Sequence, residues 1–173
     1  MNLVLAGLMG TGKTTVGKLV AARLERAFDD TDEYIHRVYG PVERIFQQPD
    51  ADKRFSQLEE EVAISLSTSN KQVIATGGRF MLNPVTADIM ARNSIVFCLE
   101  ADLHALVERL LRSTGDTFRP RFMRAENKLA LMQHLNTQSE PHYMHYKKIE
   151  TADLTPQQVA IQIIIMFNKP DTV

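Results

Sequence analysis

The amino-acid sequence predicts an α/β domain in which a parallel sheet carries helices on both faces, giving three layers. Short apolar runs alternate along the chain with longer segments of helical periodicity. The runs are apolar throughout rather than at every second residue, which is typical of strands buried on both faces of a parallel sheet. The length of 173 residues suits one domain, and no repeat or linker-like stretch divides it.

The N-terminal half begins with a strand and a helix. A compact apolar run predicts a strand over Leu3–Ala6, which ends at a glycine-rich turn. From Lys13 to about Arg26, apolar residues recur on or near one face, which predicts an amphipathic helix. The remaining elements predicted in this half are helices over Thr31–Tyr39 and Asp52–Leu66 and a strand over Gln72–Ala75, closed by Thr76-Gly77-Gly78.

The C-terminal half continues the same alternation. A helix is expected after Pro84, and Ser94–Leu99 has the composition of a buried strand. An amphipathic pattern predicts a helix over Leu103–Arg112 and another from Glu126 to about Gln138. Pro156 is expected to open the last helix, because proline is well tolerated in the first helical turn.

The composition excludes several classes of protein. Apolar residues make up 44% of the chain and charged residues 24%, which is ordinary for a globular protein and wrong for a disordered one. The 20 basic and 21 acidic residues give a net charge of −1. Such a balance provides no overall attraction to nucleic acid or to an anionic membrane, so neither is expected as a partner.

The single cysteine and the short apolar runs bear on the compartment. Cys98 is the only cysteine, so it can form no intrachain disulfide and no cysteine-based zinc cluster. The longest apolar run outside the strands, Ile163–Phe167, is far shorter than the roughly 20 residues of a membrane span. The N-terminus lacks the basic region and apolar core of a signal peptide. We therefore expect a cytoplasmic protein, and a monomer.

One motif indicates nucleotide binding. The segment Gly7–Thr14 satisfies the pattern G-x-x-x-x-G-K-[ST], and it lies between an apolar strand and an amphipathic helix, as that pattern requires. Glycines let successive N–H groups converge on phosphate oxygens, while Lys13 neutralises phosphate charge and Thr14 offers a hydroxyl to Mg²⁺. The residues expected to bind the phosphates are Gly10, Thr11, Gly12, Lys13, Thr14 and Thr15.

A cluster of carboxylates follows the first predicted helix. Asp29, Asp30 and Asp32 lie near the expected carboxyl end of a second strand, which is where parallel α/β sheets bind ligands. Neighbouring carboxylates repel one another, so the cluster favours a bound cation or a polyhydroxylated ligand. For Asp29 or Thr31 the alternative, a cap of the following helix, is at least as good. For Asp30 and Asp32 a functional role is the better interpretation.

These motifs together resemble the shikimate kinase family. In order, the chain contains GLMGTGKTTVGKLVAARL, DTDEYIHRVYGPVERIF, FSQLEEEV, VIATGG, SIVFCLEA and a lid-like RPRF, covering Leu3 to about Pro156. The resemblance implies one kinase domain over residues 1–173 with a P-loop nucleoside-triphosphate-hydrolase-type fold. It implies a five-stranded parallel sheet and a mobile lid over about residues 112–125. It also implies phosphoryl transfer from ATP·Mg²⁺ to a ring hydroxyl of a small-molecule acceptor.

The resemblance also assigns roles to single residues. Asp30 would support the Mg²⁺ shell through water, beside Thr14 as a direct ligand. Asp32 would orient the acceptor hydroxyl and take its proton. Arg119 matches the lid arginine that reaches the transferring phosphate, so the catalytic set would be Lys13, Asp32 and Arg119. Arg112 and Pro156 match the pair that sandwiches the adenine, and Gly77 and Gly78 would line the acceptor site with Asp32.

The chain departs from the family at three positions of the acceptor site. Ser56 and Ser139 stand where the family carries two arginines that clamp the acceptor carboxylate, and Arg79 stands where it carries a third glycine. Serine cannot reproduce a bidentate guanidinium–carboxylate pair. Losing both would cost several kcal/mol if each is worth about 1.5–3 kcal/mol, so we expect shikimate itself to bind poorly.

The sequence leaves the acceptor and the activity open in other respects. Arg79 could supply a carboxylate or phosphate contact from a new direction, as could Arg54 or Arg121. The first hypothesis is an ATP-dependent small-molecule kinase whose acceptor is shikimate or a different hydroxylated molecule. The alternatives are a kinase for another polyol, a sugar acid or a nucleoside, and a nucleotide-binding regulatory module without kinase activity.

Overall fold

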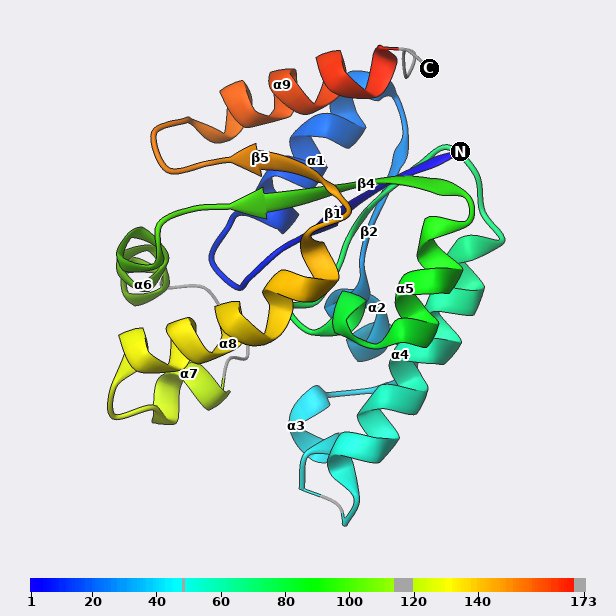
Figure 1. Ribbon diagram of the computed structural model, residues 1–173. Coiled ribbons are helices and arrows are strands. Elements are labelled where there is room, and N and C mark those ends of the chain that lie inside the picture. Colours follow the sequence, from blue (N-terminus) through cyan, green and yellow to red (C-terminus); the bar gives the residue numbers. More distant parts are fainter. Residues whose placement is uncertain (48, 114–119, 170–173) are drawn as a thin grey trace.

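A computed structural model describes residues 1–47, 49–113 and 120–169 (Figure 1). These residues form a five-stranded parallel sheet and the helices that cover it. The strands are β1 (Asn2–Ala6), β2 (Ala27–Asp30), β3 (Gln72–Ala75), β4 (Ser94–Glu100) and β5 (Lys147–Glu150). Their order across the sheet is β2-β3-β1-β4-β5, and every neighbouring pair is parallel. The predicted fold, an α/β domain with a five-stranded parallel sheet and helices on both faces, is confirmed.

The helices connect the strands and cover the sheet. They are α1 (Lys13–Leu24), α2 (Thr31–Tyr39), α3 (Val42–Ile45), α4 (Ala51–Ser67), α5 (Pro84–Ala91), α6 (Leu103–Arg112), α7 (Pro120–Arg124), α8 (Lys128–Tyr143) and α9 (Pro156–Asn168), with a 3₁₀ turn η1 (Phe80–Leu82). Pro156 opens α9 as predicted, and Thr155 and Gln158 form a capping box there. Within the described ranges, no helix combines the length and apolar character needed to cross a membrane.

Alternate residues of the central strand face the two helical layers, because side chains along a strand point to opposite sides. Leu3 and Leu5 of β1 pack with α1 and α9 in one apolar cluster. Val4 and Ala6 pack in a second cluster with residues of α4, α5 and the end of α8. Figure 1 shows these two layers on either side of the sheet. A third cluster joins α6, α7 and α8 to Leu8 of the glycine-rich turn.

The carboxyl ends of β1, β2 and β3 meet at one edge of the sheet. The turn after β3 is bonded to its neighbours: the Thr76 N–H donates to the Leu5 carbonyl oxygen at 3.0 Å, and the Gly77 N–H donates to Thr31 Oγ1 at 2.8 Å. Thr31 is fully buried. Side chains and turns from three separate strands are thereby held against one another where a parallel sheet places its ligand site.

Gly7 brings the glycine-rich turn into close contact with β4. Its φ is +128°, and a Cβ on it would collide with the backbone carbonyl oxygen of Leu99. Only glycine meets both demands, the positive φ and the close approach. The turn is thus fixed directly on the sheet edge.

We expect Gly7→Ala to destabilise the protein by about 3 kcal/mol or more, since the strain of a positive φ adds to overpacking. Gly40→Ala is the matched control, because Gly40 has a φ of +91° but no atom within 4 Å of the position that a Cβ would take. It should cost about 1–2 kcal/mol from the backbone alone. Urea unfolding of both variants measures the difference. Equal losses would show that the Leu99 contact is unimportant.

Candidate active site

The segment Gly7–Thr14 forms a closed loop between β1 and α1. Gly10 and Gly12 have φ values of +84° and +94°. Lys13, which is 8% exposed, donates from Nζ to the carbonyl oxygens of Gly7 and Leu8, both at 2.8 Å. The N-terminus of α1 has no side-chain cap and no acidic residue in its first turn. Its N–H groups therefore point, with the positive end of the helix dipole, to where phosphate oxygens bind.

Asp30 links this loop to helix α2. One of its oxygens, Oδ2, accepts a hydrogen bond from Thr14 Oγ1 at 2.7 Å. The other, Oδ1, accepts from the backbone N–H groups of Asp32 and Glu33 at 3.0 and 3.4 Å, and so caps α2. The cap of α2 is thus Asp30, a residue for which the sequence favours a functional role, and the same carboxylate can serve both purposes.

The pair formed by Thr14 and Asp30 fits Mg²⁺. Both offer hard oxygen atoms, which are the donors that Mg²⁺ prefers. Within the described residues, no group of three or more His, Cys, Asp or Glu side chains is arranged to hold a metal ion. At nucleotide sites Mg²⁺ usually takes one or two protein ligands, and phosphate oxygens and water would complete its shell.

Asp29 and Thr31, for which the sequence offers a structural role as the alternative, are both bonded to other segments of the fold. Asp29 pairs with Arg37 at 3.2 Å and accepts from Gln72 Nε2 at 3.4 Å. Thr31 accepts from the Gly77 N–H. Both hold β2 and α2 against neighbouring segments, so their role is structural, although neither caps α2.

Asp32 lies in a crevice between the phosphate-binding loop and the turn after β3. Its carboxyl group packs against Gly77, where a Cβ would leave it no room. Although the residue as a whole is exposed, its carboxyl group lies close against the backbone of Gly77. Desolvation and repulsion from Asp30 raise the pKa of Asp32 to about 6, although the attraction of Lys13 acts in the opposite direction. The group is thus mostly ionised at neutral pH but close enough to neutrality to accept a proton.

Glu59 is a second carboxyl group of this crevice, and sequence reasoning missed it. It is 7% exposed on α4, and burial and the charge of Asp32 raise its pKa to about 8, with Arg79 acting in the opposite direction. The available signal was its position: it lies three residues before Val62, which puts it on the buried face of α4. Because Glu60 and Glu61 follow it directly, Glu59 is hard to distinguish as the buried member of the run from sequence alone.

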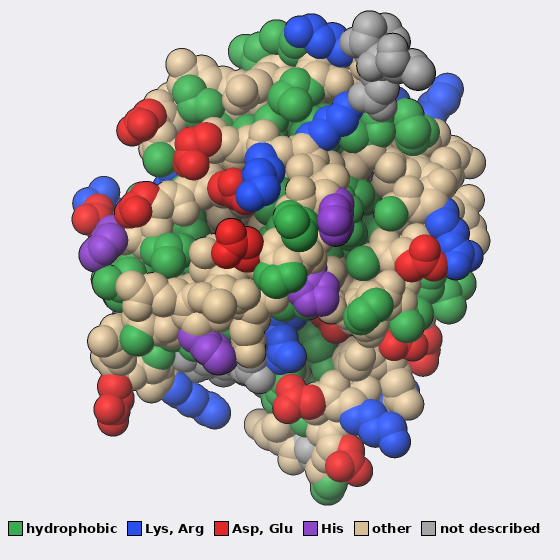
Figure 2. Space-filling view, in the orientation of Figure 1, with side chains coloured by type: hydrophobic (Ala, Val, Ile, Leu, Met, Phe, Trp, Pro, Cys, Tyr) green, Lys and Arg blue, Asp and Glu red, His purple; other side chains and the backbone are tan. Residues whose placement is uncertain are grey.

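Arg79 lies at the rim of the crevice, at the start of η1, and its side chain is exposed. Its charge acts on Glu59. Gly78, just before it, accepts a hydrogen bond from the Tyr143 hydroxyl at 3.4 Å, which ties the turn to α8. Figure 2 shows the surface hollowed between the lobe of α7 and α8 and the lobe of α3 and α4, with basic and acidic side chains at its margins.

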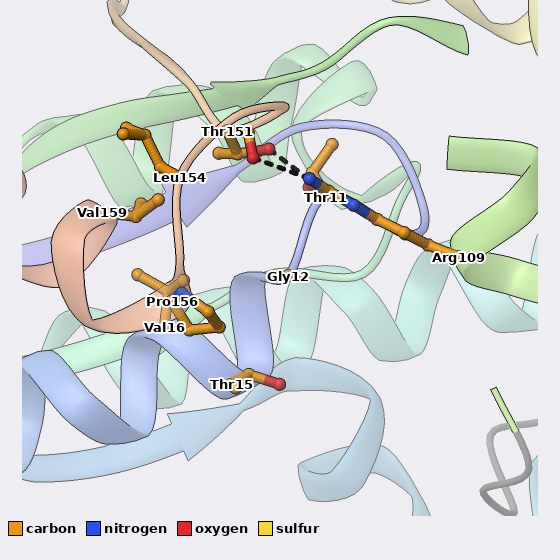
Figure 3. A pocket seen from close by; sticks show the side chains of 10 residues that line it. Thr11, Gly12, Thr15, Val16, Arg109, Thr151, Leu154, Pro156 and Val159 are labelled. Atoms are coloured by element: carbon orange, nitrogen blue, oxygen red, sulfur yellow. Dashed lines mark hydrogen bonds between the residues drawn. The ribbon is translucent and has the colours of Figure 1, made fainter. Parts of the chain in front are cut away.

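A cavity of about 190 Å³, suited in size to a nucleobase, opens beside the phosphate-binding loop (Figure 3). Arg109 reaches from α6 to the segment before α9, where it donates to Thr151 Oγ1 at 3.1 Å and to the carbonyl oxygens of Thr151 and Ala152 at 2.6 and 3.3 Å. Pro156 lies on the other side of the cavity (Figure 3). Its lining residues are Gly10, Thr11, Gly12, Thr15, Val16, Arg109, Thr151, Leu154, Pro156 and Val159.

The two remaining arginines of the predicted site are not seen in it. Arg112 is 81% exposed and pairs with Glu108 one turn back along α6, and it does not line the cavity. Arg119 lies outside the described residues. Among the described residues, Arg109 is the arginine that lines the cavity, and sequence reasoning missed it. Of the predicted residues, Lys13, Thr14, Asp30, Asp32, Gly77 and Gly78 are brought together along one sheet edge.

The fold, the glycine-rich loop and the carboxylates beside it are typical of P-loop phosphotransferases. A family model described as shikimate kinase matches residues 9–168. The chain belongs to the shikimate kinase family. It is accordingly an ATP-dependent enzyme that transfers a phosphoryl group to a hydroxyl group, with Mg²⁺ as the cofactor of the nucleotide.

Individual relatives cover nearly the whole chain. The shikimate kinase of Thermodesulfovibrio yellowstonii is 38% identical over 170 residues, which are 97% of this chain and 95% of that protein. The shikimate kinase of Caldicellulosiruptor bescii is 33% identical, covering 94% and 93%. The structure of the shikimate kinase of Acinetobacter baumannii in complex with shikimate matches with a TM-score of 0.86 at 31% identity, covering 97% of this chain and 94% of that one.

We expect Arg109→Ala to weaken ADP binding about tenfold, because the cavity loses a cationic face and its wall loses three hydrogen bonds. Inorganic tripolyphosphate, which has no base, should bind equally well to the variant and to the wild type. Isothermal titration calorimetry measures both.

Arg92→Ala is the matched control, since Arg92 is an exposed arginine that pairs with Asp88 on α5, away from the cavity. Arg112→Ala tests the role implied by the family resemblance. A larger loss of ADP binding in Arg112→Ala than in Arg109→Ala would show that Arg112, and not Arg109, contacts the base.

Proposed function

We propose that this family member transfers the γ-phosphoryl group of ATP to a hydroxyl of a small polyhydroxylated acceptor bound between Asp32 and the turn Gly77–Gly78. One observation carries the proposal most directly. Thr14, which follows Lys13 in the phosphate-binding loop, donates to Asp30 Oδ2 at 2.7 Å. Asp32, two residues further along the chain, packs its carboxyl group against Gly77. This proximity supports a role in which Asp32 holds an acceptor hydroxyl beside phosphates held by Lys13.

Each residue then has a definite task. Thr14 and Asp30 would hold Mg²⁺, and the ion bound there supplies neutralisation of phosphate charge. Lys13 and the N–H groups at the start of α1 stabilise the phosphate oxygens as charge builds on them. Asp32 orients the acceptor hydroxyl and accepts its proton as the new bond to phosphorus forms. Arg119 keeps the lid role implied by the family resemblance.

Two classes of acceptor have specific support. Shikimate is supported by the names of the relatives and by the complex of the Acinetobacter baumannii enzyme. A different hydroxylated acceptor that lacks a carboxylate, such as another polyol or a nucleoside, is supported by Ser56 and Ser139, at the positions where the family resemblance implies two carboxylate-binding arginines. A regulatory module without activity is disfavoured, since a protein of that kind would have no use for Asp32 beside Lys13 and Thr14.

The first test is a coupled assay of ADP release with Mg·ATP and a panel of shikimate, cyclic and linear polyols, sugar acids and nucleosides. At least one acceptor should stimulate ADP release well above the rate of ATP hydrolysis. Lys13→Ala should lower that stimulated rate by about 100-fold or more, because a preorganised charge at the phosphates is typically worth that much. Normal ADP binding without stimulation by any acceptor would favour the regulatory module.

We also expect kcat/KM for the acceptor to fall about tenfold per pH unit below about pH 6, where Asp32 becomes protonated. The active form is the ionised carboxylate, which is present above the pKa and lost as the pH falls through it. Initial rates between pH 5 and 8 measure the profile, with circular dichroism to confirm that the protein stays folded. Asp32→Asn should leave only a residual rate without this acidic limb. If kcat/KM of the wild type stays constant down to pH 5, Asp32 is not the base.

A further inference from the structure

We propose that Tyr143 is a positioning residue for phosphoryl transfer: its buried hydroxyl holds the phosphate-binding loop at Gly7 and the turn after β3 at Gly78 in a fixed relation. The inference rests on the proposed function, because it takes the turn Gly77–Gly78 as one side of the acceptor site. Tyr143 is the last residue of α8, 65 residues from Gly78 along the chain. Its role therefore depends on how the helix packs against the sheet.

The Tyr143 hydroxyl joins two backbone groups that follow different strands. It donates to the Gly78 carbonyl oxygen at 3.4 Å, which is a long hydrogen bond. Burial raises the pKa of Tyr143, while a hydrogen bond from the backbone N–H of Gly7 acts in the opposite direction. The hydroxyl therefore stays protonated, and a protonated hydroxyl can donate one hydrogen bond and accept another. One oxygen atom thus links the loop after β1 to the turn after β3.

The ring of Tyr143 is held in place by the core. The side chain is 3% exposed and belongs to the apolar cluster that contains Val4, Ala6 and Cys98. The ring of Tyr146 lies beside it, with the two ring centroids 6.4 Å apart. Because close packing on all sides limits the movement of a ring, the hydroxyl at its end has a defined position. A residue that positions other segments needs such support.

Helix α8 contacts the phosphate-binding loop at two places, with a cavity between them. Near the start of the helix, Met132 and Leu135 belong to one apolar cluster with Leu8 of the loop. At its end, Tyr143 bonds Gly7. A cavity of about 420 Å³ lies between helix and loop, and the residues of α8 that line it before Tyr143 are Asn136, Ser139 and Glu140. Packing across this space does not set the separation of α8 from the loop, so the contact at the end of the helix depends on Tyr143.

The turn after β3 is held from two directions. The Gly77 N–H donates to Thr31 Oγ1 at 2.8 Å, which ties the turn to the start of α2. Gly78 is bonded by Tyr143, and a Cβ on Gly78 would lie 3.7 Å from the backbone nitrogen of Met9 in the loop. The turn therefore lies directly against the loop, and Tyr143 bonds both.

This arrangement bears on the transfer step more than on the binding of either ligand. Phosphoryl transfer requires the acceptor hydroxyl and the γ-phosphoryl group to be aligned at short distance, and small misplacements lower the rate. Without the Tyr143 hydroxyl, the loop could still bind phosphates and the turn could still contact an acceptor. Their relation to each other would be less well defined.

Tyr143→Phe tests this role, because it removes the hydroxyl and keeps the ring. We expect kcat for transfer from ATP to fall about five- to tenfold, the effect of losing one or two modest hydrogen bonds. The KM for ATP and the Kd for ADP should change by less than about twofold, since the phosphate-binding groups are untouched. The coupled assay uses shikimate or, if shikimate is not phosphorylated, the acceptor of the panel with the highest rate. Calorimetry measures ADP binding.

Tyr146→Phe is the matched control. Tyr146 packs against the same core cluster, and within the described residues its hydroxyl bonds neither Gly7 nor Gly78. Its kcat should stay within about twofold of the wild type, as expected for a change away from the reacting groups. Thermal unfolding establishes that both variants fold. Equal losses of kcat in the two variants would overturn the proposal, and so would a loss of ADP binding in Tyr143→Phe as large as its loss of kcat.

Hydrogen exchange tests the link without an acceptor. Bound Mg·ADP should slow amide exchange in residues 7–14 and, through Tyr143, in residues 76–80. In Tyr143→Phe the protection of residues 7–14 should remain, while that of residues 76–80 should fall about threefold or more, because the shared hydrogen bonds are lost. Mass spectrometry of peptic fragments measures both segments. The proposal is wrong if ADP protects residues 76–80 equally in the variant and the wild type, or in neither.

These outcomes are separate from the fate of the proposed function. If nothing in the acceptor panel is phosphorylated although ADP binds, the kinase proposal fails, and hydrogen exchange still decides whether Tyr143 couples the loop to the turn. If an acceptor is phosphorylated and Tyr143→Phe keeps the kcat of the wild type, the kinase proposal stands and the inference about Tyr143 fails.

Discussion

The site is built around the carboxylate of Asp30, whose two oxygens hold two different segments. Oδ1 caps helix α2 by accepting from the N–H groups of Asp32 and Glu33. Oδ2 accepts from the hydroxyl of Thr14 at the start of α1. The start of α1 and the start of α2 are thereby joined through one side chain. A shift of either helix would break bonds to the other, so the two helices are held in a fixed relation at the end of β2.

The charges of the crevice form one coupled system rather than separate sites. Lys13 favours the ionised form of Asp32, whereas Asp30 and desolvation oppose it, and Asp32 in turn opposes ionisation of Glu59. Two carboxyl groups that repel each other titrate at different pH values, so one can act as a base while the other remains protonated.

Features set by local sequence were predictable, and those set by distant contacts were not. The runs at β1, β3 and β4 are apolar enough to be located directly, but β5 reads Lys-Lys-Ile-Glu with Ile149 alone buried, because it is an edge strand. The glycine-rich loop and the Asp30–Asp32 pair follow from their motifs. Arg109 and Arg112 lie three apart on one helix, and the choice between them depends on Thr151, 42 residues away from Arg109. The burial of Glu59 likewise appears only once α4 is packed.

The turn after β3 shows why the acceptor site can change without cost to the fold. A Cβ at Gly77 would collide with the carboxyl group of Asp32, so the Asp32 side chain would have to move. Arg79 has a φ of −118°, which any residue adopts, and its side chain extends into solvent at the rim. A cation placed at this position alters the field acting on Glu59 but strains neither the backbone nor the core. A substitution at the rim can therefore change the charge near Glu59 while the packing of Asp32 against Gly77 stays unaltered.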